Sequence, residues 1–153
     1  MRAIIQRTEG VKISAEVDGD YQVNGEMGEG LLVLLGVEES DSAEDVDYLF
    51  RKIKDMRIFN DDAGKMNLSV MDVNGSIAIV SQFTLHAKTK KGNRPSFIDA
   101  AKPETAIPLY EYFVSELKKV MQKVETGKFG ADMQVSLVND GPVTLLLDTE
   151  NKE

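Results

Sequence analysis

The stretch Leu31-Leu32-Val33-Leu34-Leu35 decides the fold class, because every one of its positions is apolar. A strand with apolar side chains on both faces is typical of a sheet that is covered on two sides. The residues before it also favour strands, since short β-prone runs are separated by the turn signals Glu9-Gly10 and Asp18-Gly19. The sequence therefore predicts four strands ahead of the first helix, at Arg2 to Arg7, Val11 to Val17, Tyr21 to Met27 and Leu31 to Leu35.

Two segments have the apolar spacing of amphipathic helices. The first begins near Ser42, which can cap a helix, and Asp45 follows three residues later, where a carboxylate favours the helix N-terminus. Its expected buried stripe consists of Val46, Leu49, Phe50, Ile53 and Met56. The second helix is expected roughly from Glu104 to Lys123, with an apolar face made of Tyr110, Phe113, Val114, Leu117, Val120 and Met121.

Further strands and turns are expected between and after these helices. Asp61 to Gly64 is predicted to be a turn, and Gly127 and Gly130 bracket another. The later strands are expected at Ser76 to Phe83, Met133 to Val138 and Val143 to Leu147. This order predicts a mixed sheet assembly with the helices stacked on one side. With 153 residues and no internal repeat or linker, the chain fits a single domain.

Composition excludes several kinds of site. The chain has no cysteine, so neither disulfides nor thiolate chemistry are available, and a reducing cytoplasm is the natural compartment. No segment is apolar for long enough to span a membrane. His86 is the only histidine, which excludes a His-rich metal site, and no metal or cofactor is expected. His86 lies too close in sequence to Thr84 to act readily as its base, so we expect His86 on the surface or at a pocket rim.

A basic loop interrupts an otherwise acidic chain. The formal net charge is −8 and the sequence pI about 4.7, which argues against strong binding of nucleic acid. Lys88, Lys90, Lys91 and Arg94 nevertheless lie close together, in a connection from His86 to Pro103 that shows no regular period. Connections of this length are uncommon and tend to be functional or disordered. The loop fits a few weak phosphate contacts, and it equally fits a solvated lysine-rich surface.

Two polar stretches follow or separate apolar strands. Ser81-Gln82-Phe83-Thr84 ends a buried run, and strand alternation puts Ser81 and Phe83 on one face unless the strand bends. Polar groups in such a place need partners or a cavity, because an unsatisfied buried group costs roughly 1–3 kcal/mol. From the residues alone, this stretch is either a strand end bonded to neighbouring backbone or part of a site. Asn139-Asp140-Gly141-Pro142 is predicted to be a tight turn between two strands.

Four stretches carry a family resemblance together. They are Ser81-Gln82-Phe83-Thr84-Leu85, Lys91-Gly92-Asn93-Arg94-Pro95-Ser96-Phe97, Phe129-Gly130-Ala131-Asp132-Met133 and Asn139-Asp140-Gly141-Pro142-Val143-Thr144. In this order they resemble the signature stretches of D-aminoacyl-tRNA deacylases, the D-tyrosyl-tRNA deacylase family. The likeness begins at Met1 and runs to about Thr149, which predicts one deacylase domain over residues 1–149 and a polar C-terminal tail over 150–153. His86 stands where similar proteins often have an aromatic residue.

The resemblance implies a fold and an activity. The implied fold is α/β, with mixed, mostly antiparallel sheets packed as a flattened barrel and two main helices on one side, in three α/β/β layers. The implied activity is hydrolysis of the ester bond of D-aminoacyl-tRNA, and of glycyl-tRNA mischarged on alanine tRNA, with rejection of L-aminoacyl groups. The implied assembly is a homodimer with the active site at the subunit interface.

The resemblance also implies roles for individual residues. Gly141-Pro142 is expected to be cis, to reach into the partner's pocket and to bind the substrate amino group through its carbonyl oxygens, leaving no space for an L side chain. Arg7 is expected to support this segment. The expected catalytic residues are Ser81, Gln82, Phe83 and Thr84. The expected pocket wall is Phe129, Met133 and Ala106, for which core packing is the alternative. The expected tRNA-binding residues are Lys88, Lys90, Lys91 and Arg94.

Thr84 is the candidate nucleophile by position, yet the sequence offers it no evident base. An aminoacyl ester is reactive and the neighbouring ribose 2′-hydroxyl can help to activate water, so substrate-assisted catalysis is favoured. Gln82 and the backbone around Phe83 and Thr84 would then polarise the carbonyl. Two alternatives stay open: a non-catalytic tRNA- or protein-binding module of the same fold, and a serine hydrolase of small esters. The retained motif argues against the first, and the missing base argues against the second.

Overall fold

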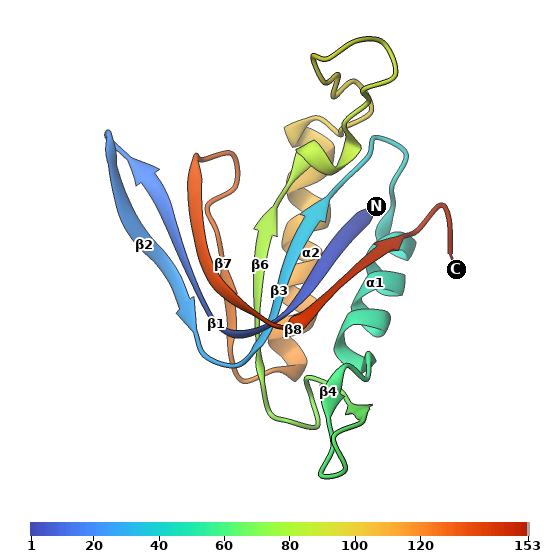
Figure 1. Cartoon of the computed structure of the whole chain (residues 1–153). Helices are drawn as coiled ribbons and strands as arrows, with labels where there is room; N and C mark the ends of the chain where they lie inside the picture. Colours follow the sequence, from blue (N-terminus) through green and yellow to red (C-terminus); the bar gives the residue numbers. More distant parts are fainter. Residues whose placement is uncertain (153) are drawn as a thin grey trace.

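The long strand β1 (Arg2–Val17) organises the sheet of the computed structural model, which describes residues 1–152. One edge of β1 pairs antiparallel with β8 (Met133–Asp148) along both of its halves. The other edge pairs antiparallel with β3 (Gly30–Gly36) in its first half and with β2 (Asp20–Met27) in its second half. β1 therefore holds three strands in place, and the sheet curls around it (Figure 1).

Two parallel strands continue the sheet beyond β3. β6 (Ser76–Ser81) lies beside β3, and β7 (Val124–Thr126) lies beside β6. The amide of Asn24 on β2 donates a hydrogen bond to the carbonyl of Thr126 on β7 at 2.7 Å, which draws the two outer strands together. The prediction of a mixed, mostly antiparallel and barrel-like sheet is confirmed.

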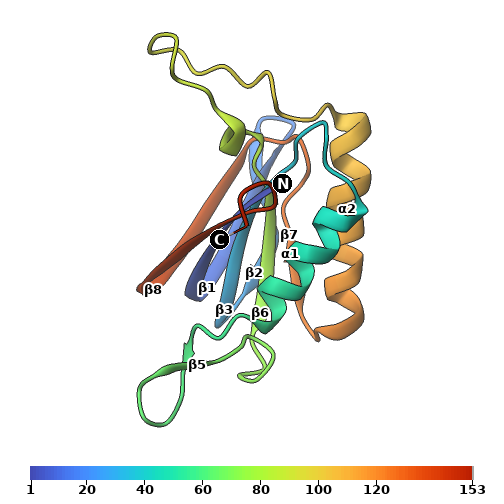
Figure 2. The ribbon, with the colours of Figure 1, turned by 90° about the vertical axis from the view of Figure 1, so that its right-hand side faces the viewer.

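The remaining elements are two helices, a 3-10 turn and a small hairpin. They are α1 (Ala43–Asp55), α2 (Pro103–Val120), η1 (Phe83–His86), β4 (Phe59–Asn60) and β5 (Met66–Leu68). Both helices cover the same face of the sheet and lie against each other (Figure 2), as the sequence predicted. Neither helix in the described part of the chain is long and apolar enough to cross a membrane.

The apolar strand β3 is covered on both faces. Leu31, Val33 and Leu35 join the main core between the sheet and the helices, where Phe113 and Leu117 of α2 are fully buried. Leu32 points to the opposite face and packs in a second cluster inside the curled sheet. Each such side chain contributes about 1.5–3 kcal/mol when it is fully removed from water. The three α/β/β layers therefore follow from a strand that is apolar at every position.

Two pairs of predicted strands are each one continuous strand, and one short strand was missed. The signal at Glu9-Gly10 does not end a strand, because β1 keeps pairing with β8 through register shifts at Gln6/Thr8 and Thr8/Gly10. The segments Met133 to Val138 and Val143 to Leu147 form one strand, β8, for the same reason. The short β7 was missed, since only its parallel pairing to β6 makes it a strand. The chain ahead of α1 thus has three strands instead of four.

The helix predictions need smaller corrections. α2 begins at Pro103, close to the expected start, but it ends at Val120. Val120 is 44% exposed and Met121 lies beyond the helix, so neither belongs to the buried stripe. At the start of α1, the main-chain N–H and the hydroxyl of Ser42 both donate to the carboxylate of Asp45, at 2.9 and 3.1 Å. Ser42 is the N-cap residue, as the sequence predicted.

Asp45→Asn is expected to lower the free energy of unfolding by about 0.5–2 kcal/mol at pH 7, as the loss of a helix cap does. Burial raises the pKa of Asp45, but hydrogen bonds from Ser42 and Thr149 outweigh it and leave the pKa below its ordinary value. The stabilisation is therefore complete above about pH 4, the pKa of an unfolded aspartate, and is lost as the pH falls through the lowered folded pKa.

Urea unfolding at pH 7 and pH 3 measures how much unfolding free energy Asp45→Asn loses at each pH. The control is Asp62→Asn in the exposed turn, which is expected to change the unfolding free energy by no more than about 0.5 kcal/mol. An equal loss for Asp45→Asn at both pH values contradicts the assignment.

Candidate active site

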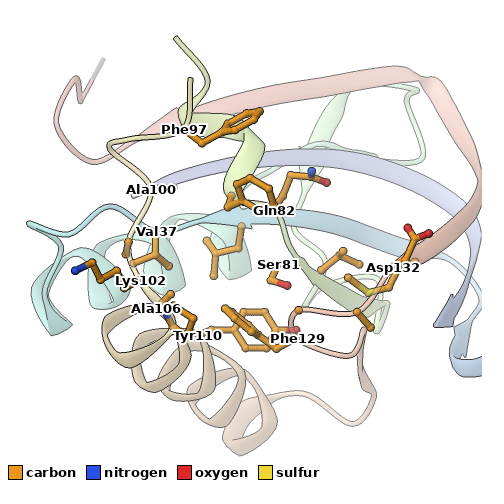
Figure 3. Close-up of a pocket in the computed structure, with 18 of the residues that line it drawn as sticks. Val37, Ser81, Gln82, Phe97, Ala100, Lys102, Ala106, Tyr110, Phe129 and Asp132 are labelled. Atoms are coloured by element: carbon orange, nitrogen blue, oxygen red, sulfur yellow. The ribbon is translucent and has the colours of Figure 1, made fainter. Parts of the chain in front are cut away.

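A cavity of about 630 Å³ opens at the C-terminal end of β6. Its floor and walls come from β3, β6, the start of α2 and the segment between β7 and β8 (Figure 3). Most of the lining is apolar, and polar side chains enter at Ser81 and Gln82 on one side and at Asp132 on another. A mostly apolar cleft with a few convergent polar groups is the usual form of a small-molecule site.

The chain bends sharply where β6 ends, and this bend shapes one side of the cavity. β6 stops at Ser81, and Phe83–His86 form the 3-10 turn η1 instead of continuing the strand to Phe83 as predicted. The N–H of Gln82 donates to the Leu35 carbonyl at 2.8 Å, and the N–H of Ala87 donates to the Thr84 carbonyl at 3.1 Å. The first bond continues the β3–β6 ladder by one residue and the second belongs to the turn, so the alternation of faces expected for Ser81 to Thr84 does not continue past Gln82.

The bend brings three of the four expected catalytic residues to the cavity. Ser81, Gln82 and Phe83 line it, whereas Thr84 is exposed and is not part of the lining. The amide of Gln82 donates a hydrogen bond to the hydroxyl of Thr84, so the two side chains are linked. At a helix start the first N–H groups have no acceptor within the helix. Gln82 is therefore the amide side chain at the cavity edge, and the first main-chain N–H groups of η1 follow it directly.

The expected wall residues Phe129, Met133 and Ala106 all line the cavity. Tyr110 of α2 lines it as well and packs edge-to-face on Phe129, with ring centroids 5.6 Å apart. Its hydroxyl donates to the Ile79 carbonyl at 3.0 Å, and burial raises the pKa of Tyr110, so the phenol stays neutral. Sequence reasoning placed Tyr110 only in the core, because helical spacing signals burial and says nothing about a cavity.

An aromatic pair stands at the mouth of the cavity. Phe83, which is 58% exposed, meets the edge of Phe97 with ring centroids 5.1 Å apart. Phe97 belongs to the long loop after η1, so this contact ties the loop to the turn that carries Gln82. The pair adds aromatic surface to the edge of the cavity, because both rings are among its lining residues.

Gly141 and Pro142 lie in a bulge of β8 beside Arg7. Gln6 pairs with Thr144 and Thr8 pairs with Asn139, so the residues 140–143 stand opposite Arg7 alone. The Gly141–Pro142 peptide bond is cis, and Gly141 has φ +121°. A side chain at Gly141 would begin 2.8 Å from the Val143 side chain and 3.2 Å from the guanidinium of Arg7, so only glycine fits.

Arg7 is buried and holds this bulge from beneath. Its Nη1 donates to the Ile58 carbonyl at 2.7 Å, and its Nε lies 2.8 Å from Oδ2 of Asp140, an ion-pair distance whose angle is too poor for a good hydrogen bond. The guanidinium therefore ties the residue before Gly141 to the segment that leads into β4. These contacts are of the type expected if Arg7 supports the Gly141–Pro142 segment.

Within one chain, the Gly141–Pro142 bulge lies level with the start of β6, whereas the cavity lies at the C-terminal end of β6. Arg7 pairs with Leu31, which pairs with Ile77, whereas Ser81 pairs with Leu35. Ile77 and Ser81 are therefore about 13 Å apart along β6, at about 3.3 Å per residue. Neither Gly141 nor Pro142 is among the described residues that line the cavity.

The basic loop extends away from the sheet and helices (Figures 1 and 2). Lys88, Lys90, Lys91 and Arg94 are all exposed. Lys88 forms an ion pair with Asp99, and its main chain bridges to Ser96. Within residues 1–152, the other three basic side chains form no ion pair, so they are available to a ligand while Lys88 is already neutralised.

His86 is buried, which contradicts the prediction of a surface or rim residue. Its Nδ1 lies 2.9 Å from Oε1 of Glu38, and its ring packs against the end of β3. The physical reason is the turn η1, which directs residue 86 back into the molecule. Among the described residues, no three histidine, aspartate or glutamate side chains gather in a group that fits a metal ion.

The structure defines an α/β protein with a mostly apolar cavity where β6 meets η1. The chain belongs to the D-Tyr-tRNA(Tyr) deacylase family, whose model matches residues 4–148. This match spans both the cavity and the Gly141–Pro142 bulge.

Several known proteins are similar over the whole length. D-aminoacyl-tRNA deacylases of Akkermansia muciniphila and Bacteroides thetaiotaomicron are 56% and 51% identical over 154 residues, covering 100% of this chain and of each relative. The solved structure of a c-Myc DNA Unwinding Element Binding Protein has a TM-score of 0.87 at 39% identity, covering 97% of this chain and 99% of that one. A probable eukaryotic D-amino acid tRNA deacylase shares the fold, with a TM-score of 0.82 at 16% identity, covering 95% and 97% of the two chains.

Arg7→Lys is expected to lower the free energy of unfolding by about 1–3 kcal/mol, because a lysine cannot serve both the Ile58 carbonyl and Asp140 and leaves a buried polar group without a partner. Urea unfolding measures the loss. Arg51→Lys, on the exposed face of α1, is the matched control and is expected to change stability by less than about 0.5 kcal/mol. Equal stabilities for both variants would show that Arg7 does not hold the bulge.

Proposed function

We propose that this chain is a D-aminoacyl-tRNA deacylase, which hydrolyses the ester between a D-amino acid and the terminal ribose of tRNA. The observation that carries the proposal is the family match over residues 4–148, with full-length relatives of that name at 51% and 56% identity. The cavity supports it, because Gln82 and the start of η1 present hydrogen-bond donors at the edge of an apolar cleft. Charged tRNA is used during translation, so the activity belongs to the cytoplasm.

A second copy of the chain completes each active site. The Gly141–Pro142 bulge is exposed and lies away from the cavity of its own chain, which supports a role in another subunit. The strand β8 also exposes apolar side chains on both sides of the bulge, with Val138 at 58% and Leu146 at 61% exposure. Exposed apolar side chains on one strand are suited to packing against a partner, and a two-fold dimer uses the same surface on both subunits. The proposed assembly is a homodimer with two equivalent sites.

The main chain of the bulge selects the hand of the substrate. The carbonyl oxygens of Gly141 and Pro142 bind the substrate amino group while Gln82 and η1 hold the ester. With these two points fixed, the third substituent of the α-carbon faces open space in a D-residue and faces the bulge in an L-residue. Selection then results from a clash and not from extra attraction. Glycine has no side chain to reject, so glycyl-tRNA is also a substrate.

Water attacks the ester, and Thr84 does not form a covalent intermediate. Thr84 is exposed and bonded to Gln82, and the one histidine of the chain is buried against Glu38. A hydroxyl without a base is a weak nucleophile at neutral pH. The ribose 2′-hydroxyl of the substrate assists the water, and the donors of Gln82 and η1 stabilise the developing oxyanion.

Deacylation assays with D-tyrosyl-, L-tyrosyl- and glycyl-tRNA test the proposal. Release from the D- and glycyl-substrates with L-tyrosyl-tRNA intact is the expected result. No release from any substrate would support a binding module, a rival that the name of the DNA Unwinding Element Binding Protein relative makes worth testing. Equal release from both enantiomers would indicate an unselective esterase.

Gln82→Ala is expected to reduce kcat for D-tyrosyl-tRNA by about 100- to 1000-fold, as the loss of one oxyanion donor does. Thr84→Ala is expected to keep most of the activity, because the attacking group is water. Single-turnover rates measure both, and Gln122→Ala, beyond α2, is the control. Loss of all activity in a folded Thr84→Ala variant would instead identify Thr84 as the nucleophile.

Lys90→Gln/Lys91→Gln is expected to raise KM for tRNA and to lower the slope of log affinity against log salt by about one unit per lysine. The substitutions remove two exposed charges from the loop beside the cavity, while kcat stays unchanged because neither side chain lines it. Binding titrations at several salt concentrations measure the slope. The control is Lys118→Gln/Lys119→Gln near the end of α2. An equal change of slope in the control would remove the loop from the tRNA contact.

A further inference from the structure

A charged cluster contacts η1 without lining the cavity, and the proposed mechanism does not use it. It consists of Arg2 on β1, Glu38 after β3, Asp148 at the end of β8 and His86 in η1 itself. Charged side chains from β1, from the segment after β3 and from the end of β8 thus gather beside one short turn.

Arg2 ties the turn to β8. Its Nη1 donates to the Leu85 carbonyl at 3.1 Å, and its Nε donates to Oδ2 of Asp148 at 3.0 Å. Its Nη2 also lies 4.0 Å from Oε1 of Glu38. The hydrogen bond and charge of Asp148 outweigh burial and raise the pKa of Arg2, so the guanidinium stays charged. One side chain therefore holds a main-chain carbonyl of η1 and the end of β8 together.

His86 anchors the same turn to β3. Its side chain is fully buried, and its Nδ1 lies 2.9 Å from Oε1 of Glu38, the oxygen that also faces Arg2, although the angle of this contact does not make a hydrogen bond. At Gly36 an added Cβ would stand 2.8 Å from the Nε2 of His86 and 2.9 Å from the carbonyl of Gln82. The imidazole and the Gln82 carbonyl therefore both pack directly against Gly36, and a side chain at position 36 would clash with them.

We propose that Arg2 and His86, joined through Glu38, are positioning residues that fix η1 and so hold Gln82 at the cavity edge. The inference rests on the proposed deacylase activity of Gln82. Arg2 fixes the turn at Leu85, His86 fixes its end, and the bond from the Gln82 N–H to Leu35 fixes its start. Gln82 stands at the start of this anchored turn, and the hydrogen bond of its side-chain amide is to Thr84.

The effect on rate follows from geometry. A donor that stabilises an oxyanion acts only within hydrogen-bond distance of the place where the charge develops. A shift of about 1 Å in such a group costs up to about 100-fold in rate without a contact to the substrate being lost. Loosening η1 therefore lowers kcat and leaves KM for tRNA, which depends on the basic loop, nearly unchanged.

Arg2→Lys is the decisive variant, because the Arg2 side chain is 30% exposed and its replacement leaves no buried cavity. A lysine keeps the charge but cannot reach Asp148 and the Leu85 carbonyl together. The matched control is Arg57→Lys, since Arg57 also donates to a main-chain carbonyl, that of Asn67 at 2.8 Å, but far from η1. His86→Ala is a supporting variant whose loss of buried packing also lowers stability.

Steady-state deacylation of D-tyrosyl-tRNA separates kcat from KM. Arg2→Lys is expected to lower kcat about 10-fold with KM within about twofold, and Arg57→Lys is expected to change neither. In a Gln82→Ala background, Arg2→Lys should cause no further loss, because it acts through Gln82. An unchanged kcat, an equal loss in Arg57→Lys, or the full 10-fold loss in the Gln82→Ala background overturns the proposal.

Amide hydrogen exchange of residues 82–87 distinguishes failure of this inference from failure of the proposed function. Faster exchange in Arg2→Lys than in the wild type and in Arg57→Lys is expected, whether or not the chain deacylates tRNA. If the wild type is inactive, the deacylase proposal fails while the exchange result still decides the anchoring of η1. Exchange that is unchanged in Arg2→Lys overturns the positioning role.

Discussion

The pairing of β8 along the whole of β1 is the constraint on which the rest of the site depends. β8 pairs with β1 on both sides of Arg7, so residues 140–143 must bulge at that one position. The same strand β1 carries β3 on its other edge, and β3 carries β6. The place of the bulge relative to the cavity is thus fixed by strand register and not by any flexible connection.

This register separates the two parts that the proposed chemistry needs. Gln82 and η1 lie beyond the C-terminal end of β6, whereas Gly141–Pro142 lies near the level of its start. Bringing them together within one chain would break the pairing of β1 with β8. In the proposed homodimer a second subunit would bring them together without breaking this pairing, and it would pack on the exposed apolar residues of β8. Under this proposal, dimerisation and chiral selection have the same structural origin.

The sequence predicted the layers of the fold because its strongest signals are local. Leu31 to Leu35 is apolar at every position, and the spacing in both helices is regular, so these elements were placed correctly. The continuity of β1 and β8 and the existence of β7 depend on pairing with distant residues, which outweighs turn signals such as Glu9-Gly10. Those features were predicted wrongly or missed.

The residues of the candidate site also divide into those that the sequence identified and those whose position depends on contacts with distant residues. Ser81, Gln82, Phe83 and the three wall residues were singled out from the family resemblance, and all of them line the cavity. The prediction that His86 lies on the surface or at a pocket rim was wrong, because the turn at η1 is held by contacts to Leu35, Arg2 and Glu38 that lie far away in sequence.

Complementation between two inactive variants tests most directly whether each site is shared by two subunits. Gln82→Ala and Gly141→Ala each inactivate both sites of a homodimer. When the two variants are mixed and allowed to exchange subunits, half of the dimers are mixed, and each of these has one site with an intact Gln82 and an intact partner bulge. The account predicts recovery of about a quarter of wild-type deacylation of D-tyrosyl-tRNA. No recovery, with subunit exchange verified, would place both groups in one subunit and contradict the account.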